Sequence, residues 1–192
     1  MKRFYSGRWF VGCLLFISVG CTTASNPPDY TSQRMDFSAV RSVAVLPLLN
    51  LSSDDQGGER VRDAFMGMLL ATEAIYVLPP GEVARGIALS GMRMPETPSI
   101  EEILKLRTVL EVDAVITGVL REYGAVRSGS AEANLLSLSL QMIETQTGTM
   151  VWSASSTRGG ISMSDRMLGS GGQPMNDITT EVINDLLDQL FE

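Results

Sequence analysis

Histidine and cysteine, on which many catalytic and metal sites depend, are absent or scarce in this chain. It has no histidine, which excludes Ser-His-Asp and Cys-His catalysis and every histidine-ligated metal site. Its two cysteines are Cys13 and Cys21. Because so few reactive groups are present, we predict no catalytic residue, no cofactor and no metal site, and we expect a protein that is not an enzyme.

The serines are arranged as in a sheet and not as in a catalytic site. They alternate with apolar residues between positions 136 and 142 and recur between 152 and 157, which is typical of half-buried strands. No general base lies at a recognisable spacing from them. The pattern predicts that the following serines form the outward face of a hairpin: Ser137, Ser139, Ser153, Ser155 and Ser156.

Two further segments have the composition of a binding site without its spacing. The acids Asp54, Asp55 and Glu59 could bind a hard cation, but the EF-hand spacing is absent and a solvated loop is favoured. The run 169–172 is rich in glycine and precedes an expected helix, as phosphate loops do. A phosphate loop also needs a preceding strand and a following Lys-Ser/Thr pair, so we interpret 159–174 as a loop.

The first thirty residues have the features of an export signal. Three basic residues precede an uncharged apolar run at 9–19, which is about half the roughly 20 residues that a membrane-spanning helix needs. Gly20 then places a small residue before Cys21. This arrangement resembles the lipobox of bacterial lipoproteins, although Ser18 stands where the lipobox most often has leucine. The resemblance implies cleavage after residue 20 and acylation of Cys21.

Cleavage at this point would leave an acidic domain attached to a membrane by lipid. It removes three basic and no acidic residues, which takes the formal charge from −7 to −10. An acidic domain repels nucleic acid phosphates and gains nothing from anionic lipid headgroups. Membrane attachment therefore depends on the acyl chains of Cys21. Thr22 stands where lipoproteins of the inner membrane often have aspartate, so the resemblance implies the periplasmic face of the outer membrane.

Composition divides the chain into three parts. Residues 1–20 form the predicted signal peptide, and residues 21–38 form the acylated cysteine with a flexible tether rich in Thr, Ser, Asn and Pro. Residues 39–192 are long enough to bury a core and are predicted to form a single α/β domain. Without a second mature cysteine, this domain has no disulfide.

Apolar periodicity predicts the element order β-α-β-α-β-β-β-α, with one further short helix at 82–90. The crossover connections predict neighbouring parallel strands and the closing hairpin adds antiparallel ones, giving a mixed sheet with helices packed on it. The segment from Gly124 to Ala133 is expected to be a polar connection. The main elements are expected at residues 42–49, 59–73, 74–78, 100–110, 113–123, 136–142, 149–157 and from about 175 onward.

Local signals place the ends of several elements. Ser99 is predicted to cap a helix whose first turn contains Glu101 and Glu102, where acids favour the helix dipole. Gly148 is expected to adopt the left-handed conformation in the turn of the last hairpin. Apolar stripes are expected on two helices, at Ile100, Ile103, Leu104 and Leu110, and at Ile178, Val182, Ile183, Leu186, Leu187 and Leu190.

The third strand and the hairpin, 113–119 and 147–152, together with the opening strand 43–47 and Asn50, resemble a group of bacterial envelope lipoproteins. The group includes the curli secretion lipoprotein family and the lipoprotein activators of penicillin-binding proteins, and the N-terminal domain of the Tol-system periplasmic protein has a similar fold. The resemblance covers about residues 40–192. It implies a non-enzymatic domain that binds another envelope protein.

Two kinds of side chain are candidates for partner contact. Trp152 is interpreted first as a core residue, because aromatic side chains bury large areas, and alternatively as an interface anchor. Methionines adapt to irregular partners, and Met92, Met94, Met163 and Met167 are candidates for exposed loops, with core filling as the other interpretation.

Two functions follow from the resemblance. The first is a lipid-anchored periplasmic lipoprotein that binds a protein partner in cell-envelope assembly or its regulation. The alternative is an oligomeric subunit of an outer-membrane secretion apparatus, as in curli secretion, and a homo-oligomer through sheet edges is left open. A pore needs hairpins with strands of roughly 9–11 residues, for which no suitable segment is recognised.

Overall fold

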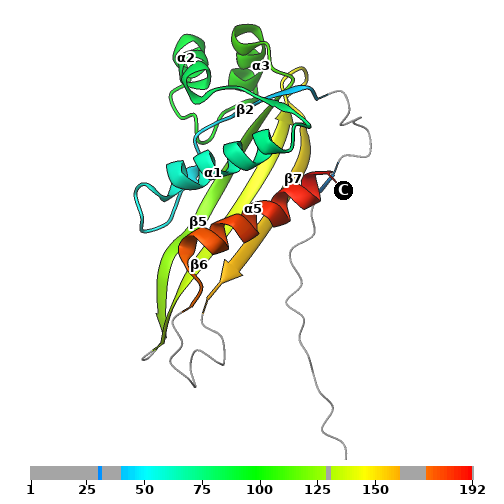
Figure 1. Cartoon of the computed structure of the whole chain (residues 1–192). Helices are drawn as coiled ribbons and strands as arrows, with labels where there is room; N and C mark the ends of the chain where they lie inside the picture. Colours follow the sequence, from blue (N-terminus) through cyan, green and yellow to red (C-terminus); the bar gives the residue numbers. More distant parts are fainter. Residues whose placement is uncertain (1–29, 32–39, 129–130, 161–171, 192) are drawn as a thin grey trace, which may run out of the picture.

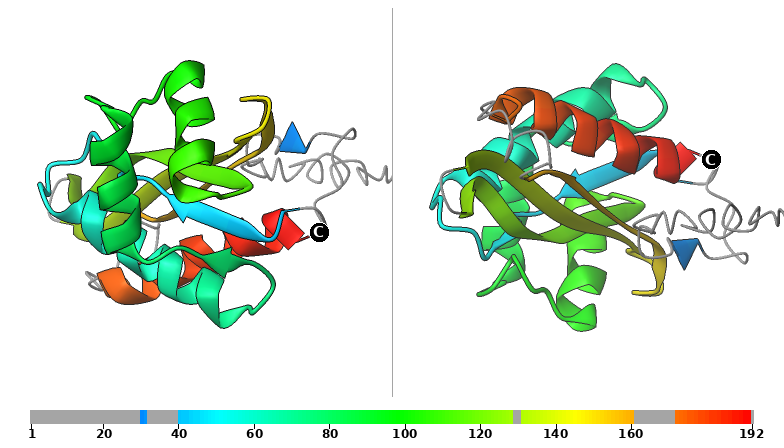
Figure 2. Two further views of the ribbon diagram at one scale, coloured as in Figure 1. Left: turned by 90° about the horizontal axis from the view of Figure 1, so that it is seen from above. Right: turned by 90° about the horizontal axis from the view of Figure 1, so that it is seen from below.

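The computed structural model describes residues 30–31, 40–128, 131–160 and 172–191. These residues form a seven-stranded mixed sheet with helices on both faces, which confirms the predicted fold class (Figures 1 and 2). The strands are β1 (Tyr30–Thr31), β2 (Ser42–Val45), β3 (Leu49–Asn50), β4 (Tyr76–Val77), β5 (Ala114–Ser128), β6 (Ala131–Glu144) and β7 (Met150–Gly159). The helices are α1 (Gly57–Ala71), α2 (Pro80–Ser90), α3 (Ile100–Leu110) and α5 (Met175–Phe191).

The parallel part of the sheet is centred on β2. This strand pairs in parallel with β4 on one side and β5 on the other, as the crossover connections predicted. Val43, Ala44 and Val45 have no exposed surface, because helices cover both faces of β2. The strand expected at 42–49 is divided in two, and Pro47, which has no N–H to donate, lies in the break between β2 and β3.

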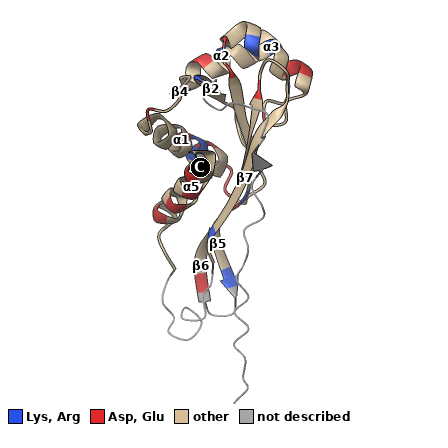
Figure 3. Cartoon of the chain, turned by 90° about the vertical axis from the view of Figure 1, so that its right-hand side faces the viewer, with Lys and Arg blue, Asp and Glu red and all other residues tan. Residues whose placement is uncertain are grey.

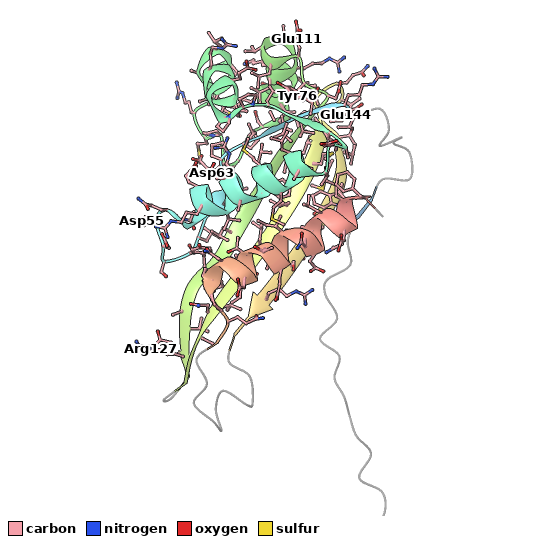
Figure 4. All side chains as sticks on the ribbon, in the orientation of Figure 1. Asp55, Asp63, Tyr76, Glu111, Arg127 and Glu144 are labelled. Carbon is pink, nitrogen blue, oxygen red and sulfur yellow. The ribbon has the colours of Figure 1, made fainter. Side chains whose placement is uncertain are left out.

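The antiparallel part follows the order β5-β6-β7-β1. Gly148 in the β6–β7 turn has φ +70°, which confirms the left-handed position. The segment Gly124–Ala133 was expected to be a connection, and this expectation is wrong. Residues 124–128 and 131–133 continue β5 and β6 as a two-stranded ribbon that extends past the helices (Figure 4). Arg127 and Glu132 form an ion pair across this ribbon at 2.9 Å.

The outer edge of β7 pairs with two residues of the segment predicted to be a tether. Tyr30 lies opposite Ser153 and Thr31 lies opposite Trp152 in an antiparallel pair. Contact with the sheet therefore starts before residue 39. Polar composition indicates a tether, but backbone pairing at a sheet edge needs no apolar side chain, so composition alone did not reveal it.

Helices cover the two faces of the sheet unequally. In Figure 2, α1 and α5 lie on one face, over the larger apolar core, and α2 and α3 lie on the other, over a smaller one. None of the described helices is long and apolar enough to cross a membrane. The expected stripe of α5 is confirmed in full, since each of its residues is buried: Ile178, Val182, Ile183, Leu186, Leu187 and Leu190.

The expected stripe of α3 is wrong in part. Ile103 is buried as predicted, but Ile100 is 60% exposed and Leu104 is 39% exposed. Leu106 is buried instead, because the side of α3 that faces the sheet follows the i, i+3 spacing from Ile103. Two large apolar side chains of α3 therefore remain at the surface.

Candidate partner-binding surface

The serines of the hairpin make contacts that join the strands to one another and to a helix. Ser137 hydrogen-bonds Thr157 across the β6–β7 pair at 2.8 Å, as residues of a polar sheet face do. Ser156 departs from the prediction, because it is buried and donates to Asp185 at 2.5 Å. Asp185 also pairs with Arg158 at 3.1 Å. These contacts attach α5 to β7, and they explain why one hydroxyl of the series faces inward.

Several of the acidic residues singled out in the sequence have structural partners. Asp54 forms an ion pair with Arg60 at 3.2 Å, at the start of α1. Ser99 and Glu102 form the capping box of α3, and the hydrogen bonds donated by Ser99 lower the pKa of Glu102. Within the described part of the chain, no group of three or more acidic or cysteine side chains lies close enough to hold a metal ion.

Trp152 belongs to the core, which corrects the alternative that it contacts a partner. It has no exposed surface, and its Nε1 donates to the carbonyl oxygen of Gln189 in α5 at 3.2 Å. Met92 is buried and Met94 is 62% exposed, so only one of these two methionines is available at the surface. The predicted lipidation site and the other singled-out residues lie outside the described residues: Cys21, Met163, Met167 and 169–171.

Exposed apolar side chains gather at the α2–α3 end of the molecule. Ile100 and Leu104 lie one turn apart on α3, and Ile100 lies against Gly148 in the β6–β7 turn. Met150, at the start of β7, is 36% exposed. Leu89, near the end of α2, is 68% exposed. Sites of this kind, where large apolar side chains face solvent, are candidates for association with another protein.

Two grooves flank the C-terminal half of α1. The first, about 530 Å³, lies between the C-terminal ends of α1 and α5 and is lined by Met68, Ala71, Thr72, Asn184, Leu187, Asp188 and Phe191. The second, about 460 Å³, separates α1 from β4 and the start of α2 and is lined by Asp63, Met66, Gly67, Leu70, Val77, Leu78, Pro79 and Pro80. Leu70 and Phe191 are 55% and 46% exposed, so both grooves have an apolar rim residue open to solvent.

The surface around the first groove is acidic. Helix α5 has acidic residues and no lysine or arginine along its whole length, and Figure 3 shows acidic positions along it. Asp188 and Asn184 lie at the rim of the groove and are exposed. Neither α1 nor α5 has a basic residue in its last turn, so neither helix supplies a cation to the negative end of its own dipole there.

The described part of the chain is a mixed α/β sheet with helices on both faces. The chain belongs to the GNA1162-like family of putative lipoproteins, whose model matches residues 28–192. This family assignment confirms the lipoprotein class to which the sequence motifs pointed. No curated protein matches the chain.

Solved structures share this fold at low sequence identity. Lipoprotein GNA1162 from Neisseria meningitidis is 20% identical, with a TM-score of 0.56 over 78% of this chain and 97% of that one. The PelC dodecamer from Paraburkholderia phytofirmans is 16% identical, with a TM-score of 0.52 over 85% and 92%. The LpoB C-terminal domain from Escherichia coli is a more distant match, 12% identical, with a TM-score of 0.48 over 63% and 84%.

The grooves are features that the sequence did not reveal. Their lining residues come from helices and strands far apart in the chain, and helical spacing does not say which apolar residues a neighbouring element leaves uncovered. The sequence did contain one signal for α3. Leu104 lies outside the i, i+3 series that contains Ile103 and Leu106, and it is 39% exposed.

Proposed function

We propose that the protein is a non-enzymatic lipoprotein that binds a protein partner in cell-envelope assembly or its regulation. It is attached through acylated Cys21 to the periplasmic face of the outer membrane. Membership of a lipoprotein family supports the anchored, envelope part of this proposal. The acidic charge supports an anchor made of acyl chains, because basic residues that would hold the domain to anionic lipid are outnumbered.

The observation that supports partner binding is the exposure of large apolar side chains on helices. Ile100, Leu104 and Met150 lie at one end of the molecule, and Leu70 and Phe191 lie on the α1–α5 layer. Each could have been polar without loss of the core, since none belongs to the two buried clusters. Burial of such residues against a partner provides the apolar contact area on which specific interfaces depend.

In-cell photocrosslinking tests this proposal. A photoreactive residue at Leu104 or Phe191 is expected to capture a discrete partner, and one at Ala125, an exposed position on the β5–β6 ribbon, is the control. Recovery of a peptidoglycan synthase, a secretion component or a second copy would identify the process. Absence of any adduct at Leu104 and Phe191, in cells that process the lipoprotein normally, would contradict partner binding.

The second candidate function is an oligomeric subunit of a secretion apparatus. The dodecameric state of PelC, which shares this fold, favours this candidate, as do the short strands β1 and β4 at the two ends of the described sheet. The pore-forming version is disfavoured. Beyond Tyr123, the part of β5 that the structure describes is Gly124–Ser128, about half of the 9–11 residues that a membrane strand needs. Analytical ultracentrifugation of the acylated protein in detergent tests for oligomers directly.

A further inference from the structure

We infer that the groove between the C-terminal ends of α1 and α5 binds a cationic amphipathic segment of a protein partner. This inference rests on the proposed function, because it specifies where a partner binds and what chemistry the partner presents. The segment would place apolar side chains in the groove and lysine or arginine at its acidic rim. The groove is distinct from the exposed residues at the α2–α3 end.

The floor of the groove is apolar and has room for more than one side chain. Leu187 and Met68 approach it from the two helices, and Phe191 stands at its rim, 46% exposed. The volume of about 530 Å³ exceeds that of any single side chain. Because two neighbouring helices form its walls, the groove has the form that receives the apolar face of a further helix.

The rim of the groove selects for positive charge. Asp188 is exposed at the rim, and no ion pair involving it is present among the described residues. The last turns of α1 and α5 both end at the groove and contain no basic residue, so their carbonyl ends add partial negative charge. Helices α1 and α5 run in the same direction, which brings their C-terminal ends together (Figure 1).

Charge complementarity decides among the occupants. A second copy of this chain is acidic and would present the same sign of charge, since the whole sequence has a formal charge of −7. The segment 32–39 of this chain contains one arginine, one aspartate, one methionine and one phenylalanine, which gives it no net charge. A cationic partner is the occupant that the acidic rim favours.

The direct test is binding of two synthetic helical peptides that share one leucine stripe. One peptide has lysine at its polar positions and the other has glutamate. Each is labelled with a fluorophore and titrated with the acylated protein in phosphatidylcholine nanodiscs, with empty nanodiscs as the blank. We expect the lysine peptide to bind, its affinity to fall as salt is raised, and the glutamate peptide not to bind.

Matched charge reversals locate the binding site. Asp188→Lys at the rim is expected to lower the affinity for the lysine peptide about tenfold, which corresponds to about 1.4 kcal/mol of binding free energy. Asp55→Lys changes the net charge equally but lies at the other end of α1, about 20 Å away along a 15-residue helix and beyond the Debye length (Figure 4). It is expected to change the affinity less than about twofold. The lysine that Asp188→Lys places in the last turn of α5 interacts favourably with the helix dipole. Unfolding of this variant therefore does not account for its loss of affinity.

Several results would overturn the inference. Equal binding of the glutamate peptide, or equal affinity of Asp188→Lys and Asp55→Lys, would show that the groove does not select a cation. Stronger peptide binding after Phe37→Ser would assign the groove to the chain's own segment 32–39. Self-association that Ala71→Arg abolishes would assign it to a second copy. Crosslinking at Leu104 but not at Phe191 would leave partner binding intact and reject this groove alone.

Discussion

The buried guanidinium of Arg62 donates two hydrogen bonds to the carbonyl oxygen of Val45, at 3.1 Å from Nε and 2.8 Å from Nη2. In the parallel β2–β4 ladder, the Leu78 N–H donates to the carbonyl of Val43, and the next amide in register belongs to residue 80. Pro80 has no N–H. The side chain of Arg62, from α1, therefore supplies the donor that β4 lacks at the end of this ladder.

Removal of this guanidinium should destabilise the fold. Arg62→Met keeps much of the apolar stem but leaves the Val45 carbonyl without its donor, which is expected to cost about 1–3 kcal/mol in the free energy of unfolding. Arg60→Met is the control, because the ion pair of Arg60 with Asp54 is exposed and contributes under about 1 kcal/mol. Urea unfolding measures both. Equal losses for the two variants would contradict the role assigned to Arg62.

Trp152 should behave as a core residue in every assay. Trp152→Ala removes a fully buried indole and is expected to lower the free energy of unfolding by about 3–5 kcal/mol. Trp152→Phe keeps an aromatic ring and loses the hydrogen bond to Gln189. It should therefore lower the free energy of unfolding by less than Trp152→Ala does. Circular dichroism during urea unfolding measures both variants. A Trp152→Ala protein of unchanged stability that no longer captures its partner would restore the interface interpretation.

Two helix glycines should respond to alanine with opposite signs. Gly67 in α1 has open space around it, so Gly67→Ala gains helix propensity and should stabilise the protein by about 0.5–1 kcal/mol. A Cβ at Gly86 in α2 would collide with the side chain of Leu110 on α3, so Gly86→Ala should destabilise by about 1–3 kcal/mol. The midpoints of thermal unfolding of the two variants and of wild type test both predictions. Stabilisation by Gly86→Ala would mean that α2 and α3 are less closely packed than described.

The capping box of α3 predicts a pH dependence. Hydrogen bonds from the backbone and side chain of Ser99 to Glu102 lower the pKa of this carboxyl in the folded state. Ionised Glu102 therefore stabilises the fold above its unfolded pKa of about 4.5, and this contribution is lost as the pH falls through the folded-state value. The thermal midpoint of wild type should exceed that of Glu102→Gln at neutral pH, and the difference should shrink as the pH falls below about 4.5. A difference in thermal midpoint that stays constant across this pH range would contradict the stabilising role of ionised Glu102 in the capping box.

The elements that sequence predicted best are those whose burial depends on local spacing. The stripe of α5 and the Ser99 cap follow from helical periodicity and from capping chemistry within one turn, and both were confirmed. The left-handed Gly148 follows from turn geometry in the same way. These features depend on neighbours within about four residues, so one sequence suffices to predict them.

Features that depend on distant contacts were missed or wrong. The β5–β6 ribbon was interpreted as a connection because its polar residues, such as Arg127 and Glu132, satisfy one another across the strands and need no core. Ser156 was placed outward because alternation does not reveal Asp185, which lies 29 residues later in the chain. The groove between α1 and α5 depends on how two helices end beside each other, which no local pattern specifies.

The central claim, that this protein is held at the envelope by lipid on Cys21, is tested most directly by the mass of its N-terminal peptide. Protein purified from the membrane fraction, digested and measured by mass spectrometry, should yield a peptide that begins at Cys21 and has the added mass of acyl chains. Cys21→Ser should yield no acylated peptide and should retain residues 1–20. An unmodified N-terminal peptide in membrane-bound wild type, or unchanged processing of Cys21→Ser, would contradict the lipid anchor.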